Sequence, residues 1–450
     1  MSILRVLHVP FCYYPDPVGG TEVYVEQLVA SLSTCGIESL IAVPADQAAR
    51  STYCDIAVYR YPLQAGVHRL RELYGGLGDV QANAAFAALL DELKPDVLHL
   101  HAFTRASGLG IVAAASERGI ATVFTYHLPN VTCQRGTLLR WGTTICDGQL
   151  HQTRCTSCSL HALGVPRPIS AAFSHLPLEF SRVMRDHGPS GGGFTAVQMR
   201  ALIELRHATV QTFFHEVDSI VVLCRWAYDL LLQLGVPATK LTLIRHGITY
   251  TVPSNPRSRS ADQPLRVAFV GRMYPIKGPD VLIRAIRQTN AVIHLDLYGY
   301  AQEQQGDQYI ASLRDLAGDD PRIRFLPPLP NAQVVPTLAT YDFLAVPSQW
   351  LETGPLVVLE AFAAGTPVLG SDLGGIAELV QDGVNGILVP AAQPEAWAAV
   401  LQRVAEQCDV VERLQAGVRP PRTMALVSSE TARLYQVVQQ NRSQMSETNA

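Results

Sequence analysis

Two glutamates stand at the two ends of an otherwise apolar segment, WLETGPLVVLE, at Glu352 and Glu360. A glycine-proline pair that starts at Gly354 favours a helix start between them. The amides of Leu356 and Val357 would then lie at the positive end of this helix, where backbone N–H groups bind anions. The carboxylates cannot bind that anion, but they accept strong hydrogen bonds from hydroxyl groups. The alternative is a pair of solvated glutamates around a helix start.

A second segment supplies positive charge. In VGRMYPIKG, residues 270–278, Arg272 directly follows a predicted strand and Lys277 lies one loop later. Arginine binds phosphate oxygens in bidentate fashion and lysine adds a point charge, although a solvated surface pair would have the same sequence. Together with the two carboxylates, these cations fit a nucleoside diphosphate-sugar, whose phosphates lie between ribose and hexose.

Glycine pairs follow predicted strands at two places. DPVGGTE, residues 16–22, contains Gly20, and SDLGGIAEL spans residues 371–379. A backbone without side chains can approach a ligand closely. The first pair lacks the full G-x-G-x-x-G spacing, which argues against a dinucleotide site.

Short strand-like runs alternate with helix-length segments, a pattern typical of α/β folds with parallel sheets. We predict strands in the first half at residues 3–11, 39–45, 96–103, 121–128 and 219–224, and helices at 19–36 and 83–95. The pattern restarts after a Pro/Ser/Arg-rich linker at 251–264, with strands at 265–271, 291–299, 323–327, 342–348, 367–372 and 385–390.

This pattern predicts two Rossmann-like domains, at residues 1–250 and 262–425, that face each other across a cleft. An insertion at about 130–215 belongs to the first domain, and a helix at 426–440 would pack back toward that domain. Ligands of such sheets bind beyond the carboxyl ends of the strands. The residues that follow strands are therefore the candidate site residues.

Composition narrows the class of protein. The 450 residues are 48% hydrophobic and 16% charged, enough for the cores of two or three domains. A net charge of -4 gives no general attraction to nucleic acid. The chain lacks a secretory start and any apolar run that could span a bilayer. We therefore expect a cytoplasmic protein with reduced thiols.

Four cysteines lie within 26 residues, at Cys133, Cys146, Cys155 and Cys158. The C-x2-C pair is a common metal-binding spacing, and four thiolates would complete a tetrahedral zinc site. An iron–sulfur cluster could use the same ligands. His151 or His161 could replace one cysteine, and four unrelated thiols are the alternative.

Taken together, VGRMYPIKG, the E-x7-E spacing of ETGPLVVLE, the run FAAGTPVLGSDLGGIAELVQDGVNGILV and the early GGTE resemble the GT-B glycosyltransferases of family 4, the retaining "group 1" type. The resemblance is strong over residues 265–400, fair over 1–130 and weakest over 130–215. It implies transfer of a hexose-type sugar from a UDP- or GDP-sugar to a carbohydrate or lipid-linked acceptor, with retention of configuration, in polysaccharide or glycolipid synthesis.

The resemblance also implies a role for each donor-site residue. Glu360 would bind the donor ribose and Glu352 the hydroxyls of the transferred sugar. Arg272 and Lys277 would neutralise the departing diphosphate, helped by the amides at the helix start, so no catalytic divalent metal is expected.

On the first domain, the resemblance places Gly20 close to the diphosphate. TVFTYH resembles the family strand that ends in an active-site histidine, which makes His127 the residue beside the C6 hydroxyl of the sugar. His101 also ends a predicted strand and competes for this role. Either histidine could instead serve only as a structural hydrogen-bonding group.

The helical segment 165–215 carries Arg167, Arg182 and Arg185. It could lie on a membrane surface that presents a lipid-linked acceptor, or pack on the first domain. Three other functions stay open: a glycoside hydrolase that uses the two glutamates as acid and base, a nucleotide-sugar epimerase, and a non-catalytic module that binds sugar nucleotides or metal.

Overall fold

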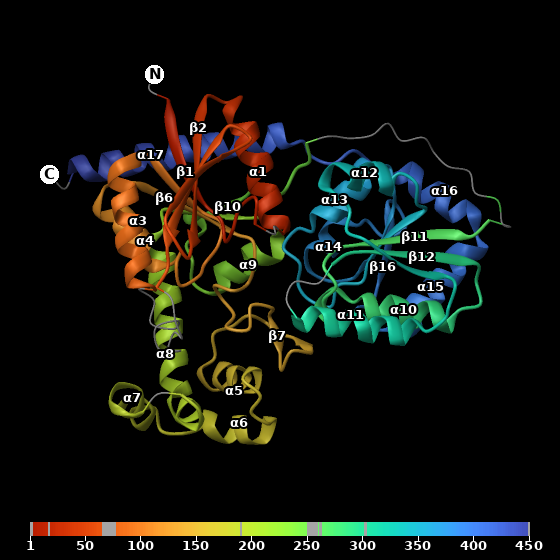
Figure 1. Ribbon diagram of the computed structural model, residues 1–450, viewed down its shortest axis with the longest axis horizontal. Coiled ribbons are helices and arrows are strands. Elements are labelled where there is room, and N and C mark those ends of the chain that lie inside the picture. Colours follow the sequence, from red (N-terminus) through yellow and green to blue (C-terminus); the bar gives the residue numbers. More distant parts are fainter. Residues whose placement is uncertain are drawn as a thin grey trace. The chain divides into compact units, whose positions relative to one another are not determined.

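The computed structural model describes residues 3–16, 19–64, 78–189, 191–249, 260, 263–300 and 304–448. The chain folds into two compact units: residues 1–245 with 425–450 form unit 1, and residues 246–424 form unit 2. Each unit contains a largely parallel sheet with helices on its faces (Figure 1), which confirms the predicted α/β class. Most of the predicted linker, residues 251–259 and 261–262, lies outside the described residues.

Unit 2 contains a six-stranded parallel sheet in the order β13-β12-β11-β14-β15-β16. Its strands are β11 (Leu265–Val270), β12 (Ile293–Tyr298), β13 (Ile323–Leu326), β14 (Phe343–Val346), β15 (Val368–Ser371) and β16 (Gly386–Val389). The strand order reverses between β11 and β14. In open α/β sheets this switch point is where ligands bind, and the predicted donor residues follow these two strands.

Alternating side chains of the unit 2 sheet enter two hydrophobic cores. On β14, Phe343 and Ala345 join one core while Leu344 and Val346 join the other. The first core is covered by α10 (Pro279–Gln288), α11 (Gln304–Ala317), α15 (Pro394–Glu406) and α16 (Cys408–Gly417). The second is covered by α12 (Asn331–Leu338), α13 (Leu356–Ala363) and α14 (Gly374–Leu379).

Unit 1 contains an eight-stranded sheet in the order β10-β9-β6-β5-β1-β2-β4-β3. Its strands are β1 (Leu4–Val9), β2 (Ile37–Ala45), β3 (Ala49–Tyr53), β4 (Ile56–Pro62), β5 (Val97–Leu100), β6 (Ala121–Tyr126), β9 (Ser219–Val222) and β10 (Leu241–Leu243). The strand order reverses between β1 and β5. Only β3 runs antiparallel to its neighbour in this sheet, as part of a hairpin with β4 that the sequence pattern did not predict.

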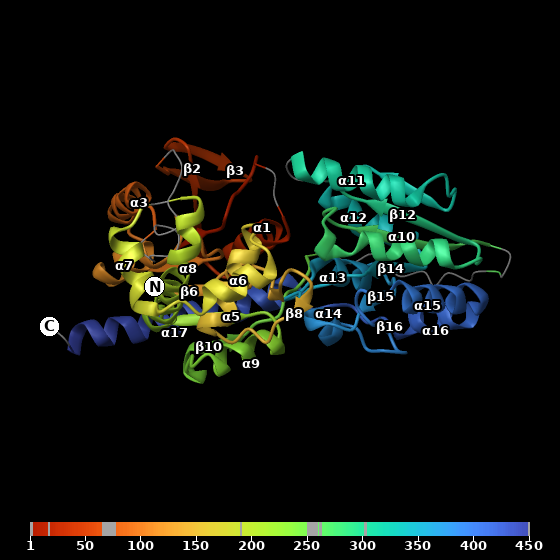
Figure 2. The same ribbon diagram turned by 90° about the horizontal axis from the view of Figure 1, so that it is seen from below.

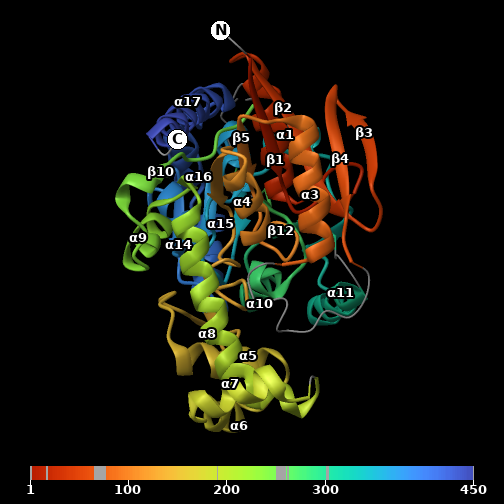
Figure 3. The same cartoon turned by 90° about the vertical axis from the view of Figure 1, so that its left-hand side faces the viewer.

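The helices of unit 1 are α1 (Gly20–Ser33), α3 (Val80–Leu93), α4 (Leu109–Glu117), α8 (Gly193–Glu216), α9 (Arg225–Gln233) and α17 (Met424–Thr448). The last helix returns to this unit and lies on the side opposite to β3 (Figures 2 and 3). The Tyr435 hydroxyl forms a hydrogen bond of 2.6 Å with His99 Nδ1, and the hydroxyls of Ser428 and Ser31 form one of 2.8 Å. These contacts attach α17 to strand β5 and to helix α1.

In each unit, an aspartate directly before one central strand hydrogen-bonds to the neighbouring strand and fixes the register of the two. Asp96, directly before β5, accepts a hydrogen bond of 2.7 Å from the Arg5 amide of β1. Asp342, directly before β14, accepts one of 2.8 Å from the Arg266 amide of β11. Each carboxylate joins the two strands at the switch point of its sheet.

The insertion of unit 1 forms an arm at the far end of α8 (Figures 1 and 3). It contains the short hairpin of β7 (Leu139–Arg140) and β8 (Thr144–Ile145), followed by α5 (Gln152–Ala162), α6 (Arg167–Ser174) and α7 (Leu178–His187). Leu160 packs with Met199, Leu202 and Ile203 in a small core. Within the described part of the chain, no helix combines the length and the apolar character needed to cross a membrane.

Candidate active site

The loop that follows β11 lies against the loop that follows β14. The Gln349 amide donates to the Ile276 carbonyl over 2.8 Å. Gly278 has a φ of +71°, and a Cβ atom there would lie only 2.1 Å from the Pro347 carbonyl oxygen. Glycine is therefore required for this approach, which brings the end of VGRMYPIKG beside the start of WLETGPLVVLE.

Lys277 and Glu352 form a buried ion pair at this junction. The lysine Nζ lies 2.6 Å from Glu352 Oε1, and the two side chains are 22% and 8% exposed. Ser348 Oγ and Trp350 Nε1 donate to the same oxygen over 2.8 and 2.9 Å. Burial raises the pKa of Glu352, but Lys277 and these bonds outweigh it and bring the pKa below its ordinary value. Glu352 is thus an ionised, preorganised acceptor.

The glycine pair of SDLGGIAEL packs against the backbone of the Glu352 loop. The Gly375 amide donates to the Glu352 carbonyl over 2.7 Å. A Cβ atom on Gly375 would lie 2.7 Å from that oxygen, and Gly374 has a φ of +52°. The close approach predicted from the sequence is therefore made to the protein backbone, and it fixes the position of Glu352.

Helix α13 begins at Leu356, one residue after the proline that was expected to open it. Its second residue is Val357. The first backbone hydrogen bond of this turn is donated by the Val358 amide to the Pro355 carbonyl. Glu360 lies in the second turn and is half-buried. Burial raises its pKa to about 7, and its carboxylate forms no hydrogen bond or ion pair with another described residue. The two glutamates therefore differ in charge state at neutral pH.

Arg272 follows β11 as predicted, and its guanidinium lies over the Tyr274 ring, 5.6 Å from the centroid. Stacking on an aromatic ring leaves the planar edge of a guanidinium available for oxygen atoms. Arg272 and Lys277 thus occupy the loop at the switch point of unit 2.

Four buried histidines gather at the strand ends of unit 1. His8 Nδ1 lies 3.1 Å from His101 Nε2, and His101 Nδ1 lies 3.2 Å from His127 Nε2. His99 bonds to Tyr435 and, over 2.7 Å, to Thr125. His101 and His127, which competed for one role in the sequence, are therefore neighbours in one hydrogen-bonded chain.

Burial keeps His8, His99 and His101 neutral. It lowers the pKa of His8 to about 3. Burial and the neighbouring histidines place the pKa values of His99 and His101 well below the ordinary value. A neutral imidazole has one donor and one acceptor nitrogen, so His101 must donate to one neighbour and accept from the other. The tautomer of His101 thereby sets whether Nε2 of His127 donates or accepts in the hydrogen bond between them.

His8, His99 and His101 form the one group of three histidine, cysteine or acidic side chains in the described residues whose ligand atoms all lie within 4.8 Å of one another. A metal ion there would need nitrogens that already have partners, because both nitrogens of His99 and His101 are hydrogen-bonded. We therefore interpret the group as a hydrogen-bonding network.

Helix α1 places Gly20 near this network. Tyr24, one turn later on the same helix, packs its ring against His127 with 5.2 Å between centroids. The Gly19 amide donates to Glu22 Oε2 over 2.8 Å, which stabilises the glycine turn at the helix start. Gly20 is the first residue of the helix.

The sequence analysis did not identify His8, His99, Ser348 and Trp350 as site residues, although the position of His99 had a recognisable pattern. Successive side chains of a strand alternate between faces, so the H-x-H spacing of His99 and His101 places both on one face, and their rings lie 4.0 Å apart. His8 pairs with His99 in the register of β1 and β5. Ser348 and Trp350 had no comparable signal.

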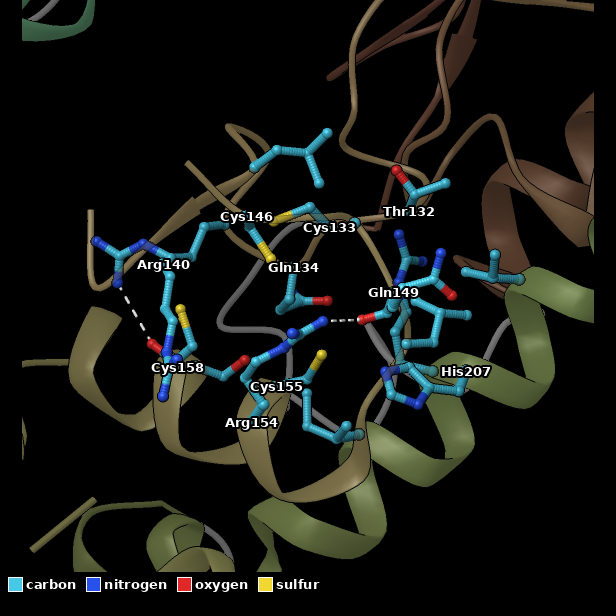
Figure 4. A pocket seen from close by; sticks show the side chains of 18 of the residues that line it. Thr132, Cys133, Gln134, Arg140, Cys146, Gln149, Arg154, Cys155, Cys158 and His207 are labelled. Atoms are coloured by element: carbon cyan, nitrogen blue, oxygen red, sulfur yellow. Dashed lines mark hydrogen bonds between the residues drawn. The ribbon is translucent and has the colours of Figure 1, made fainter. Parts of the chain in front are cut away.

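The four cysteines of the insertion line one cavity (Figure 4). Within the described residues, no three of their sulfurs all lie within 4.8 Å of one another, as the histidine ligand atoms do, so they do not form a ready-made site for a single zinc ion. His207 lines the same cavity. His161, considered as a substitute ligand, bonds to the Val165 carbonyl over 3.1 Å, and His151 precedes α5 as its cap residue.

The arginines of the arm are largely engaged with neighbouring side chains. Arg182 pairs with Glu179 and Glu204, and Arg185 pairs with Asp186. Arg167 lies over the Trp141 ring. Positive charge on this surface is therefore mostly compensated.

Comparison with known proteins agrees with these two units. Residues 19–247 match the family model described as "Glycosyl transferase 4-like domain", and residues 264–407 match "Glycosyl transferases group 1". The chain belongs to the group 1 glycosyltransferases of family 4, which have the GT-B fold.

Relatives match over part of their length. D-inositol 3-phosphate glycosyltransferase from Saccharomonospora viridis is 40% identical over 165 residues, 34% of this chain and 37% of the relative. The enzyme of the same name from Salinispora arenicola is 32% identical over 227 residues, 45% of this chain and 50% of the relative. The chain thus matches about a third to a half of the length of these curated relatives.

Solved structures match over nearly the whole chain. HepE from Anabaena, in complex with UDP and glucose, has a TM-score of 0.63 at 16% identity and covers 96% of this chain and 100% of its own. Sucrose-phosphate synthase from Thermosynechococcus elongatus has a TM-score of 0.65 at 18% identity, with 97% and 99% covered. At this identity they show the fold alone.

The buried ion pair predicts a specific pattern of stability. Lys277→Met leaves the Glu352 carboxylate buried without its cation and should lower the free energy of unfolding by about 3 kcal/mol. Adding Glu352→Gln to the same chain removes the charge and should restore most of this loss. Urea denaturation followed by tryptophan fluorescence would measure both effects, because Trp350 adjoins the pair.

Arg284→Met is the matched control, since Arg284 is an exposed cation of the same unit. It should change the free energy of unfolding by less than about 0.5 kcal/mol. A double variant as unstable as Lys277→Met alone would contradict the ion-pair account.

Proposed function

We propose that this chain transfers a hexose-type sugar from a nucleoside diphosphate-sugar to an acceptor. The observation that carries the proposal is the buried pair of Lys277 and Glu352 at the switch point of unit 2, within the region that matches the group 1 model. A fixed, ionised carboxylate suits the hydroxyls of a sugar, and the adjacent ammonium suits a phosphate. We assign donor binding to residues 262–425 and acceptor binding to residues 1–250.

Breaking the bond between sugar and phosphate places negative charge on the departing diphosphate. Preorganised cations and amides stabilise such charge most effectively when water is excluded. In this proposal Arg272 and Lys277 supply the cations, and the amides of Leu356 and Val357 at the start of α13 supply the dipoles. These groups take the place of a catalytic divalent metal.

Glu360 binds the ribose hydroxyls of the donor in this proposal. Its pKa of about 7 reflects a carboxylate that burial disfavours, and two hydroxyl donors would relieve that cost. Gly20 approaches the diphosphate, and His127 lies beside the C6 hydroxyl of the sugar, with the hydrogen-bonding role of its Nε2 set by His101.

We also propose the base of the donor nucleotide, the kind of acceptor and the stereochemistry of transfer. A UDP- or GDP-sugar fits the site residues, and HepE with UDP and glucose is a solved structure of the same fold. Retention of configuration follows from the family type. The relatives named D-inositol 3-phosphate glycosyltransferases support a polar, hydroxyl-rich acceptor, and we include a role in cytoplasmic polysaccharide or glycolipid synthesis.

Contact with a membrane surface is also part of the proposal. Its support is the arm of unit 1, where the exposed large apolar side chains include Leu163, Ile169, Phe180, Val183 and Phe194. Amphipathic helices bury such side chains at the boundary between headgroups and acyl chains. The compensated arginines make this an apolar rather than an electrostatic surface.

Glu360→Gln tests the donor site. Loss of one charge-assisted hydrogen bond, about 1.5–3 kcal/mol, should lower kcat/KM for the nucleotide-sugar roughly 10- to 100-fold. In the unchanged chain the KM for the donor should rise as the pH falls from 8 to 6, because Glu360 becomes protonated as the pH falls through its pKa of about 7. In Glu360→Gln this dependence should disappear.

The measurement is release of nucleoside diphosphate coupled to product formation, and Glu395→Gln is the control because Glu395 is exposed on the same unit. Full turnover in Glu360→Gln would refute the role of this carboxylate. Free sugar released from an oligosaccharide without nucleotide would instead support the hydrolase alternative, and product formed without acceptor would support the epimerase.

His101→Phe tests the histidine chain. It removes both bonds to His8 and His127, and the resulting misplacement of His127 should lower kcat about 10- to 100-fold with little change in the donor KM. His101→Gln can donate and accept and should recover part of kcat. Equal loss of kcat in the two variants, or no loss in either, would contradict a positioning role.

A further inference from the structure

The cavity lined by Cys133, Cys146, Cys155 and Cys158, called the cysteine cavity below, has no role in the proposed transfer. Three separate segments supply its thiols: the loop after β6, the end of the β7–β8 hairpin, and helix α5, where Cys155 and Cys158 lie one turn apart. Figure 4 shows these side chains around one pocket. The fold therefore brings together four thiols that the sequence separates by up to 25 positions.

The spacing of the sulfurs is wide for a single ion. Around one zinc ion with Zn–S bonds of about 2.3 Å, tetrahedral geometry places sulfurs about 3.8 Å apart. Among the described residues, no three sulfurs of this quartet all lie within 4.8 Å of one another, and the residues that carry them line a cavity. A larger group with several metal atoms fits between such ligands, as in clusters held by four cysteines.

The charge around the cavity favours an anionic group. Four arginines line it and no aspartate or glutamate does, and the arginines are Arg135, Arg140, Arg154 and Arg206. Arg154 is already paired with Asp147 through its terminal nitrogens, while its Nε is buried and has no hydrogen-bond partner among the described residues. Four thiolates around a metal centre carry net negative charge, which these guanidinium groups would compensate.

The backbone is also arranged around the sulfurs. The Trp141 amide lies 3.4 Å from Cys158 Sγ and donates to it, and hydrogen bonds to sulfur tune thiolate-bound clusters. Leu138 and Trp141 have φ values of +53° and +60°, which are strained for residues with a Cβ atom. The Cys146 amide bonds to the Leu138 carbonyl over 2.8 Å. The strained hairpin thus positions Cys146 through its backbone and Cys158 through the hydrogen bond to its sulfur.

We propose that the cysteine cavity binds a thiolate-ligated metal centre and that the width of the quartet selects an iron–sulfur cluster over a single zinc ion. Each cysteine forms one iron–sulfur bond and releases its thiol proton to solvent. The centre is structural, because it joins three segments of the arm.

The test uses the full chain purified without oxygen. Iron, acid-labile sulfide and zinc are measured per chain, together with visible absorbance and the thermal midpoint. We expect iron and sulfide in equal amounts, roughly two to four of each per chain, with a broad visible band. Cys155→Ser and Cys146→Ser should each lose both, and Cys54→Ser, a change at an exposed cysteine of the same unit, should keep both.

If the cysteine variants fail to fold, reconstitution of the metal-free unchanged chain with ferric iron, sulfide and a thiol reductant decides the question. Uptake with a rise in the thermal midpoint supports the proposal. No uptake, or the same metal content in Cys155→Ser as in the unchanged chain, overturns it. One zinc per chain without iron overturns the cluster. None of these readouts depends on sugar transfer, so the proposal stands or falls separately from the proposed function.

Discussion

The buried carboxylate of Glu352 determines how the loops after β11 and β14 of unit 2 pack. Glu352 is 8% exposed on its side chain and ionised, and such a charge is stable only when it is paired and fully hydrogen-bonded. Lys277, Ser348 and Trp350 all converge on one of its oxygens. The loops after β11 and β14 must therefore lie together, and glycines at two places allow the backbones to approach closely enough.

The same relation between sheet and site appears in unit 1. Its polar side chains gather where the strand order reverses, at the ends of β1 and β5, and continue to the end of β6. These buried side chains bond largely to one another: His8, His101 and His127 form one hydrogen-bonded chain, and His99 bonds to Tyr435 of the last helix, while Nε2 of His8 has no partner among the described residues. In both units, the parallel sheet fixes where buried polar groups can be held, and the chemistry follows from that position.

Much of this could be predicted because it is local. Strand-forming runs, the E-x7-E spacing and the cations after a strand are short-range patterns, and the predicted strands of both sheets were found. The β3–β4 hairpin was missed because its exposed residues lack an alternating apolar pattern. The bond between His99 and Tyr435 joins residues 336 positions apart, and spacing alone could not show how far apart the four cysteine sulfurs lie.

Binding of nucleoside diphosphates tests the central claim most directly, because it needs no knowledge of the acceptor. Ligand binding raises the thermal midpoint by mass action. The account predicts that UDP or GDP, but not NAD, raises the midpoint of the unchanged chain, and that the double variant Lys277→Met/Glu352→Gln, which keeps its fold, shows no such rise. An equal rise in the double variant, or no rise with any nucleoside diphosphate, would contradict it.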